Sequence, residues 1–123
     1  MGGDKVRRVY CVVDCGIAVN PDVVRAQMEG GIIFGLSAAL DQEITLVDGV
    51  VQQTNYDTFP LLRMFETPEI IVQILDSDKD PTGVGEPGLP PVAAAVANAM
   101  FALTGVRLRR MPLQRAWNER GAK

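Results

Sequence analysis

The order of apolar and polar residues along this chain predicts several short strands and two longer helices. β-Branched and aromatic residues gather between turn signals in five segments, a pattern typical of strands. These segments are residues 6–14, 43–47, 50–53, 69–75 and 106–110. Asp48-Gly49, between the second and third segments, is the favoured two-residue turn of a β-hairpin. We expect the fourth strand to be buried, residues 55–65 to form a loop, 76–82 a solvated turn and 111–123 a polar tail.

Two segments carry helix signals. Asn20-Pro21-Asp22 supplies an N-cap, a proline at the first helical position and an acid in the first turn, which predicts a helix over residues 21–40. Its apolar residues repeat at helical spacing: Val24, Met28, Ile32 and Leu36. The second helix, 91–104, is almost entirely apolar and is expected to be buried on all sides. The order β-α-β-β-β-α-β indicates one α+β domain over residues 1–123, built on a mixed sheet.

Composition removes several kinds of function. A net charge of −3 provides no attraction for nucleic acid or an anionic membrane, and the longest strongly apolar stretch, 90–103, is too short to span one. The chain is expected to be soluble, in a cytoplasmic or a periplasmic setting. It has no histidine, which excludes Ser-His-Asp and Cys-His catalysis. Cys11 and Cys15 would lie about 13 Å apart on an extended strand, too far for a disulfide, and two cysteines cannot form a metal site.

The segment GVGEPGLPP, residues 83–91, spaces Gly83, Gly85 and Gly88 as dinucleotide-binding loops do. Such a loop must follow a strand tightly and open a helix. Here a polar stretch precedes it and three prolines interrupt it, so a nicotinamide or flavin site is a weak alternative. The glycines and prolines would instead hold Glu86 stiffly just before the second helix, where the helix dipole favours a carboxylate that could act as a general base. An exposed turn glutamate explains the segment equally well.

The first helix contains glycines that are costly there. Gln27, Gly31 and Gly35 are four residues apart and share one face. Each glycine costs a helix about 1 kcal/mol relative to alanine, so another group must approach this face closely. Taken alone, the pattern favours packing against another backbone. The alternative is a flat ligand on the glycines with the Gln27 amide bonded to its polar edge, which would suit a pterin or a base.

Three segments together resemble a known family. They are VVDCGIAVNPDVVRAQMEGGIIFGLSAAL, NYDTFPLLRM and PTGVGEPGLPPVAAAVANAMFALTG. In this order they resemble the C-terminal part of the molybdenum-binding large subunit of the xanthine oxidase family, within it the isoquinoline 1-oxidoreductase β-subunit type and related aldehyde and nicotinate dehydrogenases. The resemblance covers nearly the whole chain, from about Val9 to Pro112.

The resemblance implies a molybdenum enzyme that hydroxylates an aldehyde or an N-heteroaromatic compound with oxygen from water. It implies that Glu86, framed by Gly83 and Gly85, is the base that deprotonates the attacking hydroxyl. It also implies that Gln27, with Gly30 and Gly31 beside it, contacts a molybdopterin cofactor in its cytosine dinucleotide form. The protein ligates no metal through its own side chains in this scheme.

A full large subunit is several times longer than this chain. The resemblance therefore implies two protein partners, the remainder of the large subunit and a small iron–sulfur subunit that accepts the electrons, and no cofactor or activity in the isolated chain. Neither cysteine belongs to a cluster motif, and Asn55 and Tyr56 are given structural roles. A non-catalytic packing or assembly domain is the other interpretation that the residues leave open.

Overall fold

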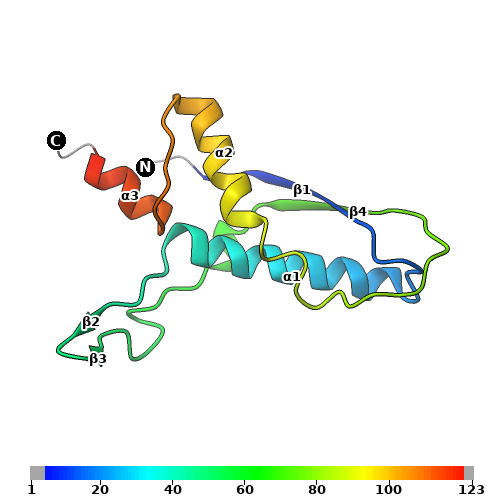
Figure 1. Ribbon diagram of the computed structural model, residues 1–123, viewed down its shortest axis with the longest axis horizontal. Coiled ribbons are helices and arrows are strands. Elements are labelled where there is room, and N and C mark those ends of the chain that lie inside the picture. The colour runs from blue at the N-terminus through cyan, green and yellow to red at the C-terminus, as the bar shows by residue number, and fades with distance from the viewer. Residues whose placement is uncertain (1–4, 121–123) are drawn as a thin grey trace.

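The computed structural model of the protein describes residues 5–120. Its elements are β1 (Arg8–Val13), α1 (Pro21–Leu40), β2 (Leu46–Val47), β3 (Val50–Val51), the 3-10 helix η1 (Met64–Glu66), β4 (Glu69–Ile74), α2 (Val92–Thr104) and α3 (Leu113–Arg120). β1 pairs in parallel with β4, from Arg8 opposite Glu69 to Val13 opposite Ile74, whereas β2 and β3 form a separate antiparallel pair. The predicted α+β class is confirmed (Figure 1).

α1 runs through the centre of the fold beside all the larger elements (Figure 1). It begins as predicted, because the Asn20 side chain accepts a hydrogen bond from the Val23 N–H at 3.2 Å and Pro21 occupies the first helical position. The predicted apolar stripe is buried along its whole length. Its first half packs with Val13 and Cys15, and its second half packs with α2 and α3. The core thus consists of two clusters that lie along one helix.

By length and composition alone, α1 could also cross a membrane, which was not predicted for this segment. Core helices of proteins without any membrane span can have the same length and apolar composition. In the fold 39% of this stretch is buried, with one side against the β1–β4 sheet and another against α2. That position is the position of a core helix.

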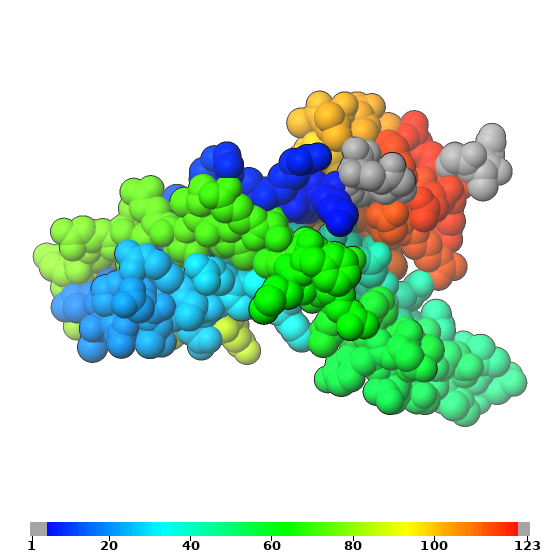
Figure 2. Space-filling model, turned by 180° about the vertical axis from the view of Figure 1, so that it is seen from behind, coloured from blue at the N-terminus to red at the C-terminus, as the bar shows by residue number. Residues whose placement is uncertain are grey.

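A hairpin arm, which we define as residues 43–66, projects from the rest of the molecule at its β2–β3 end (Figures 1 and 2) and returns to the core at Leu62, whose N–H donates a 2.9 Å hydrogen bond to Ser37 Oγ. Asp48 and Gly49 at its tip have φ values of 50° and 79°, as the predicted two-residue turn requires. The strands beside the turn are shorter than predicted, with two residues each. The arm exposes many large apolar side chains: Ile44, Leu46, Val47, Val50, Val51, Tyr56, Leu61, Met64 and Phe65.

The C-terminal region differs from the prediction. Residues 106–110 form no strand, and the expected polar tail contains the helix α3; residues 121–123 lie outside the described part. Leu113 at the start of α3 is only 2% exposed, and Ala116 and Trp117 pack beside it at helical spacing. Leu108 is buried as well, but it reaches the core from irregular backbone. An apolar residue every few positions was therefore a sign of core contact here, not of a strand.

The helix expected to be buried on all sides and the strand expected to be buried each have an open face. Only Val92, Val96 and Met100 of α2 are buried, and β4 alternates between exposed and half-buried residues. α2 thus carries more apolar surface than the described residues bury.

Cys11 and Cys15 are free thiols in the core region, as predicted, and burial raises the pKa of the Cys11 thiol.

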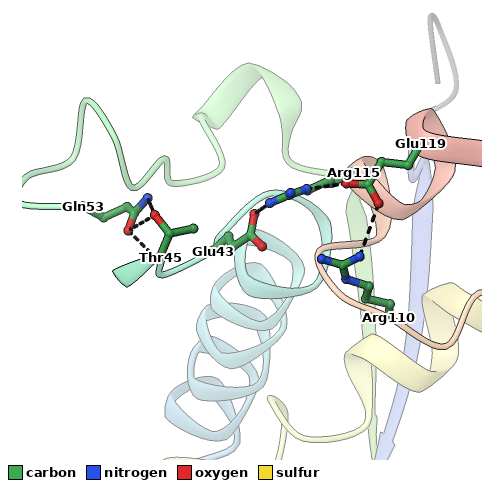
Figure 3. A network of polar contacts seen from close by, with 6 residues as sticks. All are labelled: Glu43, Thr45, Gln53, Arg110, Arg115 and Glu119. Carbon is green, nitrogen blue, oxygen red and sulfur yellow. Dashed lines mark hydrogen bonds and ion pairs between the residues drawn. The ribbon is translucent and has the colours of Figure 1, made fainter. Parts of the chain in front are cut away.

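Polar contacts join α3 to the base of the hairpin arm (Figure 3). The Arg115 guanidinium binds the Glu43 carboxylate and donates a 2.7 Å hydrogen bond to Glu119, which also pairs with Arg110 at 3.4 Å. The hydrogen bond from Arg115 lowers the pKa of Glu119. All these side chains are partly exposed, so the network is a surface connection.

Candidate functional site

Residues 75–91 return along α1 after β4 and carry the segment GVGEPGLPP (Figure 1). Their first part is fixed by backbone hydrogen bonds to the turn after β1: Thr82 N–H to Cys15 O and Ile17 N–H to Lys79 O, both at 2.9 Å. Gly16 in that turn has a φ of +69°, and a Cβ there would lie 2.2 Å from Asp80 O. The stretch 76–82 is polar, as predicted, but its backbone holds the motif in place. The glycine directly after Cys15 was the sequence signal for this contact.

The motif then packs backbone to backbone against α1. A Cβ on Gly88 would lie 3.0 Å from Met28 O, and one on Gly31 would lie 3.4 Å from Leu89 N. Gly35 is tighter still, since its Cβ would lie 3.0 Å from Leu89 O and 2.9 Å from Val92 Cγ2. The helix glycines at positions 31 and 35 are therefore explained by close packing of this chain against itself. Gly31 meets Gly88 and Leu89, and Gly35 meets Leu89 and Val92.

A neighbouring part of the same helix is uncovered. Gln27 is exposed, and its Nε2 would lie 3.8 Å from a Cβ on Gly85, so the fold brings the predicted amide to the predicted loop. A Cβ on Gly30 or on Gly83 would meet nothing within 4 Å in the described residues. Gly30 therefore costs helix stability without any packing gain within this part of the chain.

Glu86 lies at the outer side of the loop. Val84, two residues earlier, packs into the cluster that contains Val24 and Met28, whereas Gly85 and Glu86 are exposed. Within residues 5–120 the Glu86 carboxylate makes no hydrogen bond or ion pair. Val84 thus anchors the loop from within and leaves the carboxylate accessible to a group that approaches from outside.

The position of Glu86 relative to α2 differs from the prediction. Its carbonyl accepts a hydrogen bond from the Leu89 N–H at 2.9 Å, and the Leu89 carbonyl accepts one from the Val92 N–H at 3.2 Å. These two turns, enforced by three prolines, separate Glu86 from α2, which begins at Val92. Helix dipole effects fall off within the first turn, so they do not act on this carboxylate as expected. The same separation, together with residues 75–82 after β4, departs from the geometry of a dinucleotide-binding loop.

The uncovered surface combines three chemical properties: a free carboxylate, an amide with two donors and one acceptor, and bare helix backbone at Gly30. It can take up a proton and hydrogen-bond the edge of a flat polar ring. Residues 5–120 contain no group of three His, Cys, Asp or Glu side chains that could hold a metal ion. Asn55 and Tyr56 lie on the hairpin arm, where the Asn55 carbonyl accepts hydrogen bonds from Thr58 and Phe59, as a turn residue does.

Comparison with known proteins gives concordant matches. A model of the molybdopterin cofactor-binding domain matches residues 2–68. The chain is 44% identical over 111 residues to isoquinoline 1-oxidoreductase subunit beta of Brevundimonas diminuta, covering 90% of this chain and 14% of that protein. It is 40% identical over 110 residues to the membrane-bound pyrroloquinoline-quinone aldehyde dehydrogenase of Gluconacetobacter polyoxogenes, with 89% and 14% covered.

A solved structure matches as well. The chain resembles the crystal structure of quinoline 2-oxidoreductase from Pseudomonas putida 86 with a TM-score of 0.79 and 25% identity, over 89% of this chain and 15% of that one. The protein thus spans about a seventh of the length of the relatives that it matches.

Proposed function

Because the chain belongs to the molybdopterin cofactor-binding domain family of the xanthine oxidase-type molybdenum oxidoreductases, we propose that it is part of a molybdenum hydroxylase in which Glu86 is the general base. The observation that carries this proposal is the meeting of Gln27 with the Gly83–Glu86 loop on an uncovered surface. Two elements far apart in the sequence supply the amide and the carboxylate there.

The residues present fit a pterin. The Gln27 amide has no hydrogen-bond partner within residues 5–120, and the bare backbone at Gly30 leaves room for a flat ring beside it. A pterin edge offers donors and acceptors that an amide can match. We assign Gln27, Gly30, Gly83 and Gly85 to the pterin contact. Gly31 instead allows the loop to pack closely against the helix. The cytosine dinucleotide form of the pterin is part of the proposal.

When bound, the molybdenum cofactor would supply the two-electron oxidation of an aldehyde or N-heteroaromatic substrate, with oxygen from water. Glu86 would accept the proton of the attacking hydroxyl on a carboxylate oxygen, and Gln27 would orient the pterin ring by hydrogen bonds. The electrons would pass to iron–sulfur clusters on a small partner subunit. The isolated chain is inactive in this proposal, because the remainder of the large subunit supplies most of the cofactor and substrate pocket.

The test is Glu86→Gln in the complete molybdenum-binding subunit that carries this chain. We expect molybdenum and pterin contents to stay normal while turnover falls by about 10²–10⁴-fold, the usual contribution of a general base. Glu29→Gln is the matched control, since Glu29 is an exposed glutamate on α1. Turnover of the Glu86 variant equal to that of the Glu29 variant would refute the assignment. Analysis of the same preparation for molybdenum, pterin and quinone identifies the cofactor.

A non-catalytic packing or assembly domain is the second candidate, favoured by the close contacts of Gly31, Gly35 and Gly88, which need no ligand. It predicts that Glu86→Gln and Gln27→Ala leave the turnover of the complete enzyme unchanged. A stability change alone, with normal turnover in both variants, would support it.

A further inference from the structure

An open groove of about 1130 Å³ lies between β1, α1 and α2. Ile32 and Leu36 of α1 form part of its floor, and its lining is mainly apolar. Gln27, Gly30, Gly85 and Glu86 are not among its lining residues, whereas Pro87 and Gly88 are, so the groove borders the candidate functional site without containing these four residues. Pockets for small ligands usually enclose about 300–1,000 Å³. The size and openness of this groove fit a segment of polypeptide better.

The groove follows the free edge of β1. Every residue from Lys5 to Asp14 lines it, and no residue of β4 does. Successive side chains of a strand point to opposite faces, so a groove that touches all of them meets the strand edge and not one face. Within residues 5–120, β1 pairs with β4 on its other edge and with no further strand.

The backbone groups that face the groove can be assigned. Arg7 O accepts a hydrogen bond from Glu69 N–H at 3.1 Å, and Val13 O accepts one from Leu75 N–H at 2.9 Å. Odd-numbered residues of β1 therefore turn their backbone groups to β4. Arg8, Tyr10 and Val12 turn theirs to the groove, because these groups alternate between the two edges of a strand.

The opposite wall comes from the open face of α2. Ala95, Ala99 and Leu103 are four residues apart, line the groove and are exposed, Leu103 to 74%. Ala94 on the same helix is equally exposed but does not line the groove. A free strand edge thus faces an apolar helix face across a gap.

We propose that this groove binds an extended segment from the remainder of the molybdenum-binding subunit, which adds a third strand at the free edge of β1. Parallel strands occur almost only in larger sheets that are covered on both faces, whereas here the parallel sheet has two strands. The matched relatives carry most of their length outside the region shared with this chain, so the same polypeptide can supply the strand. The proposal extends the function above, but it depends only on the chain being part of a longer subunit and not on Glu86.

Amide hydrogen exchange tests it directly. In the 123-residue chain alone, the Tyr10 and Val12 amides are expected to exchange fast and the Cys11 and Val13 amides slowly. In the complete subunit all four should be protected, with exchange of Tyr10 and Val12 slowed by more than about tenfold. Fast exchange of Tyr10 and Val12 in the complete subunit would overturn the proposal. Protection that rises with concentration in the chain alone would assign the groove to a second copy and equally overturn it.

A pair of helix variants provides an independent test. Ala99→Glu places a charge in the groove, and Ala94→Glu places the same charge on the uninvolved face of α2. In the chain alone both variants should melt like the unmodified protein, because both positions are exposed. In the complete subunit only Ala99→Glu should lower the melting temperature and the soluble yield. Equal behaviour of the two variants there would count against the strand. Protection of Tyr10 and Val12 in a Glu86→Gln enzyme would separate this proposal from the catalytic one.

Discussion

The middle of α1 and its C-terminal end hold their neighbours by different means. Along the glycine-bearing part, the loop 86–92 lies against the helix backbone, with Gly88 placed so that a Cβ would come within 3.0 Å of Met28 O. At the C-terminal end, the hairpin arm begins with Glu43, which is connected to α3 through Arg115. The Arg115 and Glu43 side chains are 46% and 29% exposed.

The contrast shows which part of the fold is held firmly in position and which part is held weakly. Backbone contacts at glycines leave no free space for movement, so they fix the Gly83–Glu86 loop relative to Gln27. Solvated ion pairs fix geometry weakly and contribute little stability. The candidate site is therefore built on the tight contact. The start of the arm is held by the loose one, whereas its C-terminal part is tied to α1 by the hydrogen bond from Leu62 N–H to Ser37 Oγ at 2.9 Å.

Among the substitutions that test this comparison, Gly88→Ala is expected to have the largest effect on the fold. Its Cβ would press on Met28 backbone atoms, which cannot rotate away, so the loop must shift and the free energy of unfolding should fall by about 1–3 kcal/mol. Urea unfolding of the 123-residue chain measures this. Gly83→Ala is the control, because a Cβ there meets nothing within 4 Å. Equal stability of the two variants would show that the glycine contact does not fix the loop.

Gly30→Ala is expected to act in the opposite direction on stability. Its Cβ would enter open space on α1, and alanine is favoured over glycine in a helix by about 1 kcal/mol, so the isolated chain should gain roughly that amount. In the complete enzyme the same methyl group would occupy the surface assigned to the pterin. We expect a lower pterin content per subunit there. A stabilised variant with normal pterin content would remove Gly30 from the proposed site.

Much of this arrangement follows from local sequence signals. The Asn20-Pro21-Asp22 start, the four-residue spacing of the α1 stripe and the Asp48-Gly49 turn each act over a few neighbouring residues, and all appear as predicted. The spacing of Gly31 and Gly35 also predicted that another group approaches this face of α1 closely. It could not reveal that the partners lie in residues 88–92, since that depends on how residues 75–82 return along the helix.

The misassigned segments have a different cause. Leu108 and Leu113 are buried in a core cluster that includes Ile32 and Leu36 of α1, which is distant in sequence, so no local period marked residues 106–110 as irregular or 113–120 as helical. For α2 the expectation of burial on all sides fails within the described residues because its second apolar face borders the groove beside β1. The composition of that helix reflects more contacts than this chain provides.

Arg115→Gln is expected to give the smallest effect, a slight loss of stability that depends on salt and pH. The pKa of Glu119 is lowered in the folded protein by Arg115, so the contribution of the pair is present above the ordinary glutamate pKa and is lost as the pH falls through the lowered value. It should also shrink at about 1 M salt, where the screening length is roughly 3 Å. Melting curves at neutral and acidic pH, with and without salt, measure this difference. Arg109→Gln is the matched control, since Arg109 makes no ion pair within residues 5–120. A loss for Arg115→Gln as large as that for Gly88→Ala, and insensitive to salt, would mean that the arm is held as firmly as the loop and that the middle and the C-terminal end of α1 do not differ.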